Sequence, residues 1–167
     1  MKINAAVRQI LPVSALVLAV MATTVRAKER SGADRTYDGA VSDALAIAEQ
    51  RPELSVVRVA GQSMLPYFGD DAVVVVKKID AARLRVGMIA VYVNRFGEKV
   101  AHRIVSPVAG GWQVQGYNNT QADSTVVNAS NLLGIVYATF NSAGRDPLAV
   151  AASNLPNLET VHAAPAR

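Results

Sequence analysis

The pattern of apolar and polar positions changes at about residue 54, where short extended runs replace an alanine-rich stretch. Valine and isoleucine dominate these runs, and the sequences between them contain glycine. β-branched residues favour strands, and glycine favours the turns that join them. The runs predict six strands: Leu54–Ala60, Ala72–Lys78, Met88–Asn94, Lys99–Ser106, Trp112–Gln115 and Leu133–Phe140. Regularly spaced short strands are typical of one architecture class, so we predict a mainly β fold, a compact coiled β-barrel or sandwich.

The first segment has the pattern of a targeting element. Lys2 and Arg8 precede an uncharged, mostly apolar run over Ile10–Val25, which is shorter than the roughly 20 residues needed to span a bilayer. Val25-Arg26-Ala27 then places small or β-branched residues at −3 and −1 before a charged stretch, as cleavage sites do. We therefore predict an apolar helix in residues 1–27, as a signal peptide or a membrane anchor. Either would send the rest of the chain across the membrane. A buried helix of a cytoplasmic protein is the alternative.

Two further segments flank the predicted strands. Residues 28–53 combine a polar linker with one short packing helix, predicted from Asp38 to Gln50 and ended by Pro52. Its apolar residues recur at helical spacing: Val41, Ala44, Leu45 and Ala48. Residues 141–167 are rich in alanine, asparagine and proline without sustained periodicity, which predicts a loosely ordered tail. We give His162, in this tail, no role. The strand-rich region between the two segments, residues 54–140, is the predicted catalytic domain.

Composition narrows the function classes. The 167 residues suffice for one domain with a core, and 51% hydrophobic but only 5% aromatic residues suit a valine-rich β fold. The net charge of +4 is scattered, without the basic stripe and interleaved aromatics that nucleic-acid binding needs, so we predict no nucleic-acid partner. The chain has no cysteine and only two histidines, a poor set of metal ligands. The glycines form no phosphate-binding or dinucleotide motif, so no cofactor is predicted.

The segment Gly61-Gln62-Ser63-Met64-Leu65-Pro66 presents a candidate nucleophile next to a predicted strand. A serine hydroxyl attacks poorly until a base takes its proton. Gly61 permits close approach of another backbone, and Pro66 stiffens the exit of the turn, so the segment can hold the hydroxyl of Ser63 in a fixed place. We expect the backbone N–H of Ser63 to donate to an oxyanion. Taken alone, an ordinary turn serine is the alternative.

A candidate base and a candidate acid follow the serine along the chain. Strand alternation puts His102 on one face with Val100 and Ile104, where desolvation favours the neutral imidazole that a general base needs. Asp123, in a polar loop, could accept the other N–H of the imidazole and orient it. A core histidine bonded to a backbone carbonyl and a turn-forming aspartate are the alternatives. For the carboxylates of the Gly69–Asp71 turn we predict only a local turn role.

These segments, in this order, resemble the conserved boxes of the signal peptidase I superfamily of membrane-associated serine peptidases, which also includes the self-cleaving repressor-type peptidases. The resemblance covers roughly residues 54–140. The histidine box is similar to that of the endoplasmic-reticulum and archaeal-type branch, where histidine replaces a lysine base. The matching boxes are Gly61–Pro66 with Gly69-Asp70, Leu84–Tyr92, His102–Val105, and Gly116–Asn119 with Asp123.

The resemblance implies a serine endopeptidase with a β-rich catalytic domain on the outer side of the membrane. By that likeness the site consists of the nucleophile Ser63, the general base His102, the orienting acid Asp123, and the nucleophile-box residues Gly61, Met64 and Pro66. Its members cut exported precursors after small residues at −1 and −3. We therefore expect a precursor polypeptide as substrate, membrane association, and an extracytoplasmic location, either anchored in the inner membrane or exported to the periplasm.

The chain also departs from the family pattern. Tyr117 stands where the last box normally has aspartate, Gly61 replaces a hydroxyl residue common in bacterial members, and the turn after Pro66 is about two residues short. The large accessory domain of the major bacterial enzymes is missing between Val91 and His102.

Two alternatives therefore stay open. One is a catalytically inactive secreted β module that serves as a binding or structural unit. The other is a self-cleaving repressor-type domain, although no helix-turn-helix is recognisable. The only Ala-Gly pair upstream of the serine, Ala60-Gly61, lies too close to it to be cut.

Overall fold

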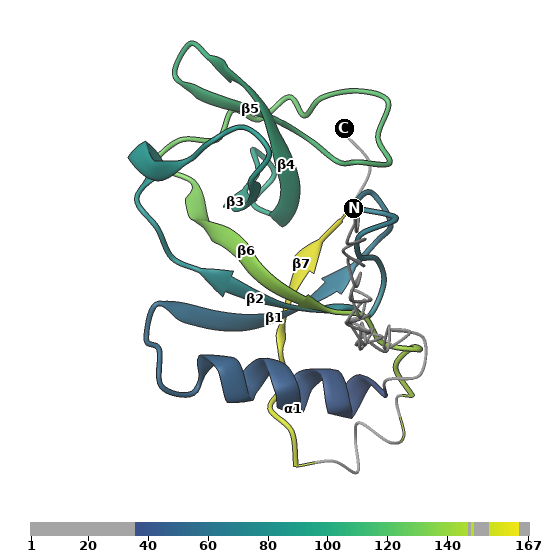
Figure 1. The fold of residues 1–167 in the computed structure, drawn as a ribbon. Coiled ribbons are helices and arrows are strands. Elements are labelled where there is room, and N and C mark those ends of the chain that lie inside the picture. Colours follow the sequence, from purple (N-terminus) through teal and green to yellow (C-terminus); the bar gives the residue numbers. More distant parts are fainter. Residues whose placement is uncertain (1–35, 147, 149–153, 164–167) are drawn as a thin grey trace, which may run out of the picture. The chain divides into compact units, whose positions relative to one another are not determined.

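A computed structural model describes residues 36–146, 148 and 154–163 of the chain. All of them belong to one unit, Ser31–Arg167, while residues 1–35, which include the predicted targeting segment, lie outside the described part. The described elements, in chain order, are α1 (Tyr37–Ala48), β1 (Leu54–Ala60), β2 (Val73–Lys77), the 3-10 helix η2 (Ala81–Arg83), β3 (Ile89–Val93), β4 (Lys99–Val108), β5 (Gly111–Gln115), β6 (Leu132–Phe140) and β7 (Glu159–His162), as Figure 1 shows. Among the described helices, none combines the length and the apolar composition that crossing a bilayer requires.

The strands form a closed barrel. They follow the order β3-β6-β2-β1-β7-β4-β5, and β3 also pairs with β4, so the first six strands of this order close on themselves. β5 continues as an antiparallel hairpin partner of β4. β7 differs from the others, because it runs parallel to both of its neighbours, β1 and β4. The predicted mainly β fold is confirmed, in its barrel form.

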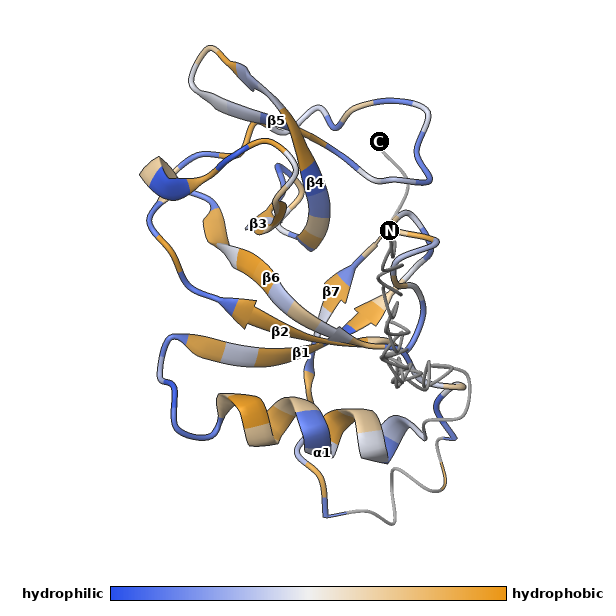
Figure 2. Ribbon diagram, viewed as in Figure 1, coloured by the Kyte–Doolittle hydropathy of each residue, from blue (hydrophilic) through white to orange (hydrophobic). Residues whose placement is uncertain are grey.

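Valine-rich strands build this barrel because both faces of its central strands are covered. In β2 all four valines are buried, and alternate residues serve different cores. Val74 and Val76 belong to one apolar cluster, which also holds the nucleophile-box residue Met64. Val73 and Val75 face α1 and pack against Ala44 and its neighbours. Figure 2 shows mostly apolar colouring along β2, and apolar turns that alternate with polar ones along α1.

The predicted packing helix is present as α1. The side chain of Thr36 caps its first turn by accepting a hydrogen bond from the Gly39 N–H. Its buried residues, Tyr37, Ala40, Val41 and Ala44, contact the β1–β2 sheet from outside the barrel. As predicted, it contributes apolar packing.

The C-terminal segment corrects one prediction. Instead of a loosely ordered tail throughout residues 141–167, residues 159–162 form β7, in register with Val57–Ala60 of β1. Val161 is buried, with 1% of its surface exposed, and the Thr160 hydroxyl accepts a hydrogen bond of 3.0 Å from Arg58. A strand of four residues is too short to leave a periodic pattern, and its main partner, β1, lies about a hundred positions earlier in the chain, which hid it from sequence reasoning.

Candidate active site

Ser63 lies in a tight loop directly after β1. Gly61 adopts φ 107°, a conformation that residues with a side chain rarely take, and its N–H donates to the Asp70 carboxylate over 2.6 Å. Met64 is fully buried and anchors the loop in the barrel core. The role of Asp70 is therefore larger than a turn former, because its carboxylate fixes the backbone just before Ser63.

The structure brings the three predicted catalytic side chains together. The distance from Ser63 Oγ to His102 Nε2 is 2.8 Å, and that from His102 Nδ1 to Asp123 Oδ2 is 2.7 Å. His102 comes from β4 and Asp123 from the loop between β5 and β6. With Nδ1–H donating to the carboxylate, Nε2 is left to accept the hydroxyl proton of Ser63. Ser63 and His102 are buried, at 4% and 1% exposure, so the pair is shielded from water.

Asp123 is held by groups that sequence reasoning missed. The Tyr92 hydroxyl donates to the same Oδ2 that receives His102, and the Asp123 N–H donates to the Val114 carbonyl over 2.9 Å. Burial, together with the hydrogen bond to Asp123, raises the pKa of Tyr92 far above its ordinary value, so the phenol stays a donor. Tyr92 reaches Asp123 because Ala90 pairs with His102 across β3 and β4, which makes Tyr92 a diagonal neighbour of His102 on the same face.

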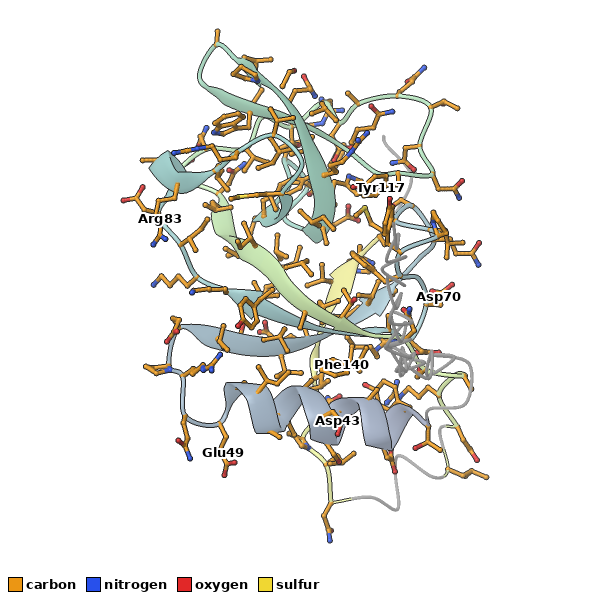
Figure 3. All side chains as sticks on the ribbon, in the orientation of Figure 1. Asp43, Glu49, Asp70, Arg83, Tyr117 and Phe140 are labelled. Carbon is orange, nitrogen blue, oxygen red and sulfur yellow. The ribbon has the colours of Figure 1, made fainter. Side chains whose placement is uncertain are left out.

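Tyr117, which stands where the family has aspartate, takes no part in this hydrogen-bonded line. Its ring lies 4.3 Å from the ring of Tyr67, and the Arg103 guanidinium lies 4.5 Å from its centre on the opposite side of β4 from His102. In the view of Figure 3, Tyr117 lies above the loop that carries Asp70. Position 117 therefore contributes an aromatic and cationic stack beside the site, and the carboxylate that bonds to His102 is that of Asp123.

The Gly116–Asn119 segment clamps the backbone of the nucleophile. The Asn118 N–H donates to the Ser63 carbonyl over 2.7 Å, and the Asn118 side chain reaches the Gln62 carbonyl over 3.3 Å. A Cβ on Gly116 would lie only 2.7 Å from the backbone carbonyl oxygen of Ser63. Glycine is required at position 116 because the two backbones touch there, a function that the sequence alone did not indicate.

The Ser63 N–H, the expected oxyanion donor, already has a partner. It donates over 2.8 Å to the carbonyl oxygen of Ala163, the residue that follows β7. The Ala163 N–H in turn donates to the Ala60 carbonyl over 2.7 Å, which extends the parallel pairing of β7 with β1 by one residue. The donor predicted for an oxyanion therefore binds a peptide carbonyl of the same chain.

The arrangement is suited to acyl transfer: a hydroxyl, an imidazole that can take its proton, and a carboxylate that orients the imidazole. Within the described ranges, no group of three or more histidine, cysteine, aspartate or glutamate residues could hold a metal ion.

Comparison with known proteins agrees with this geometry. No curated protein and no solved structure matches the chain. The family model described as Peptidase S24-like matches residues 19–137, well over half of the chain. The matched range includes the serine, the histidine and the aspartate of the site. The chain therefore belongs to the Peptidase S24-like family, within the serine peptidase superfamily that also contains signal peptidase I.

Proposed function

We propose that this protein is a signal-peptidase-like serine endopeptidase that cuts exported precursor polypeptides after small residues. The observation that carries the proposal is the continuous line of hydrogen bonds from Ser63 through His102 to Asp123. Membership of a serine peptidase family supports the class of reaction. The choice of exported precursors rests on the resemblance to signal peptidase I and on the predicted targeting segment in residues 1–27.

In the proposed mechanism His102 Nε2 takes the hydroxyl proton of Ser63 as Oγ attacks the carbonyl carbon of the scissile bond. Asp123 keeps the imidazole in the required tautomer and stabilises it once it is protonated. The Ser63 N–H donates to the oxyanion once the substrate carbonyl has replaced the Ala163 carbonyl, which accepts this N–H in the structure. His102 then protonates the departing amine, and a water molecule, activated by the same imidazole, releases the acyl group from Ser63.

The surroundings of the site favour this chemistry over a structural role for the same residues. A buried histidine bonded to a backbone carbonyl would need neither a serine hydroxyl nor a carboxylate, yet His102 has both. The carboxylate of Asp123 is itself mostly buried, at 10% side-chain exposure. Burying a carboxylate is costly unless it receives strong hydrogen bonds, and here two donors, Tyr92 and His102, converge on one of its oxygens.

Location and membrane association belong to the same proposal. If residues 1–27 act as an export signal or anchor, the domain lies outside the cytoplasm, where the cleavage sites of exported precursors emerge. The protein would then be anchored in the inner membrane or released into the periplasm, with the precursor polypeptide as its partner.

The test is cleavage of a precursor that carries a signal peptide with an A-x-A site, in detergent micelles, by the full chain. Ser63→Ala removes the nucleophile, and Ser55→Ala is the matched control, because Ser55 is an exposed serine on β1. We expect cleavage at the A-x-A site by the wild type and the control, and none by Ser63→Ala. Failure of the wild type on several precursors, together with no reaction of Ser63 with a fluorophosphonate, would favour an inactive β module.

A further inference from the structure

The strand β7 lies where an extended peptide would have to lie to reach the catalytic pair. It runs parallel to β1, which leads directly into Ser63, and to β4, which carries His102. Four residue pairs join β7 to β1, and the pair Val100↔His162 joins it to β4. Adding a strand at a sheet edge is a common way for a protein to bind an extended peptide. In this structure the chain's own segment Glu159–Ala163 takes that place.

The Ala163 carbonyl occupies the hydrogen-bond donor that the oxyanion needs. Its oxygen accepts the Ser63 N–H over 2.8 Å, while the Ala163 N–H donates to the Ala60 carbonyl over 2.7 Å. A good hydrogen bond requires the hydrogen to point at its acceptor, so one N–H serves one acceptor well at a time. The Ser63 N–H therefore binds either the Ala163 carbonyl or a substrate carbonyl, and each excludes the other.

The same arrangement closes access to the catalytic pair. Ser63 and His102 are 4% and 1% exposed, and Ala163, bonded to Ser63, is fully buried. Before attack, the scissile carbonyl carbon has to come within about 3–3.5 Å of the nucleophile. A precursor cannot come that close while Ser63 is covered and its N–H is engaged, so β7 and the precursor compete for one site.

The side chains of β7 are also of the kind expected in a substrate. In an extended strand Val161 and Ala163 point to the same face, two residues apart as the −3 and −1 residues of a precursor are. They are 1% and 0% exposed and belong to the same buried cluster as Met64 and Ala101. A precursor with small or β-branched residues at −3 and −1 places equivalent side chains in this cluster. Exchange of the two strands therefore replaces each buried contact with a similar one.

The polar side-chain contacts that hold β7 lie at the barrel surface. Lys99 Nζ lies 2.5 Å from Glu159 Oε2, and Arg58 donates to the Thr160 hydroxyl over 3.0 Å. Surface ion pairs contribute little to stability. β7 thus depends mainly on backbone pairing and on two small buried side chains, both of which a precursor strand can supply.

We propose that β7 is an internal inhibitor of the peptidase. While Glu159–Ala163 lies between β1 and β4, the site is latent, and cleavage begins only after a precursor strand has displaced this segment. The inference rests on the proposed function, which supplies the substrate, and it adds a regulation of that same site.

A disulfide that fixes β7 to β1 tests the proposal in the full chain. Arg58 and Thr160 are Cα partners in the parallel register, their side chains meet on the face opposite to the core residues Val57 and Val59, and the chain has no cysteine of its own. Paired residues of neighbouring strands have the Cα separation that a disulfide spans. The double variant Arg58→Cys with Thr160→Cys is therefore compared with itself, oxidised and reduced.

Two rates are measured in each redox state. One is cleavage of a precursor with an A-x-A site, and the other is labelling of Ser63 by a fluorophosphonate, whose phosphoryl oxygen needs the same Ser63 N–H. We expect both rates to be at least about tenfold lower in the oxidised form, because the fraction of molecules with a free site falls, and to recover on reduction. The wild type, taken through the same oxidation and reduction, should keep its rates.

Glu159→Lys loosens β7 without altering a catalytic group. It sets a second positive charge beside Lys99, so displacement becomes easier. At low salt and low precursor concentration we expect cleavage to speed up by about twofold to fivefold, the factor that an exposed ion pair usually contributes. Glu53→Lys makes the same charge change at an exposed residue just before β1 and should leave the rate unchanged.

The outcomes separate this inference from the proposed function. Equal cleavage and equal labelling in the oxidised and reduced forms would make β7 a permanent part of the wall, which overturns the inhibitor and leaves the peptidase standing. Labelling of Ser63 that depends on reduction, without cleavage of any precursor, supports the inhibitor and contradicts the signal-peptidase-like function. Neither labelling nor cleavage in either form overturns both.

Discussion

Replacement of Gly116 by alanine should disable the site by displacing Ser63, although every catalytic side chain is kept. The new Cβ would lie 2.7 Å from the Ser63 carbonyl oxygen, 2.9 Å from the Ser63 Cβ and 2.9 Å from the side-chain amide nitrogen of Asn119. Ordinary van der Waals contact begins at 3.4 Å. Two of these atoms belong to the nucleophile itself, so relief requires Ser63 to move by about 0.7 Å. Misplacement on this scale costs roughly tenfold to a hundredfold in rate, and the overpacking costs about 1–3 kcal/mol of stability.

The assay is the rate at which a fluorophosphonate labels Ser63, measured below the melting midpoint and expressed per folded molecule. Gly134→Ala is the matched control, because a Cβ there would meet the Lys77 carbonyl at 2.5 Å, between β6 and β2 and apart from the catalytic groups. The control should melt at a lower temperature yet label at the wild-type rate. Labelling of Gly116→Ala at the wild-type rate, with an unchanged melting temperature, would refute the clamp on Ser63.

Two further substitutions separate catalysis from packing around the site. Asp123→Asn should lower the rate of precursor cleavage by about a thousandfold or more, because an amide no longer fixes the His102 tautomer. A full rate, measured under the same conditions, would leave a Ser63–His102 dyad as the catalytic unit. Tyr117→Ala should instead cost about 1–2 kcal/mol of stability by removing the ring stack with Tyr67 and the contact with Arg103. Urea unfolding checks the stability, and a cleavage rate that falls as far as in Asp123→Asn would contradict this assignment.

Much of the barrel could be predicted because each strand can be recognised from a short stretch of its own sequence. The boundaries of β1 match the prediction at both ends, and those of β2 differ by one residue at each end. Runs of valine mark the strands, and the glycine-containing turns between them mark where each strand begins and ends. β4 extends to Val108, past its predicted end at Ser106, because pairing with β5 continues there.

What escaped prediction depends on contacts between distant parts of the chain. The gathering of Ser63, His102 and Asp123 was predicted through the resemblance to a family, since spacing alone places none of them. The hydrogen bond from Tyr92 to Asp123 and the contact of Gly116 with Ser63 arise only once the barrel has closed. β7 is the extreme case, because parallel pairing with β1 depends on a partner about a hundred residues away.

The barrel wall is completed by a strand that can, in principle, be exchanged. Without β7, the open edges of β1 and of the first residues of β4 would face each other with unpaired backbone groups. Any extended peptide that fits between these edges therefore pairs with both of them and completes the barrel. Its binding free energy then adds directly to the free energy of unfolding. A chain ending before residue 159 would thus report each peptide it accepts as a rise in melting temperature. Substrate preference could then be measured by calorimetry, with no bond being cut.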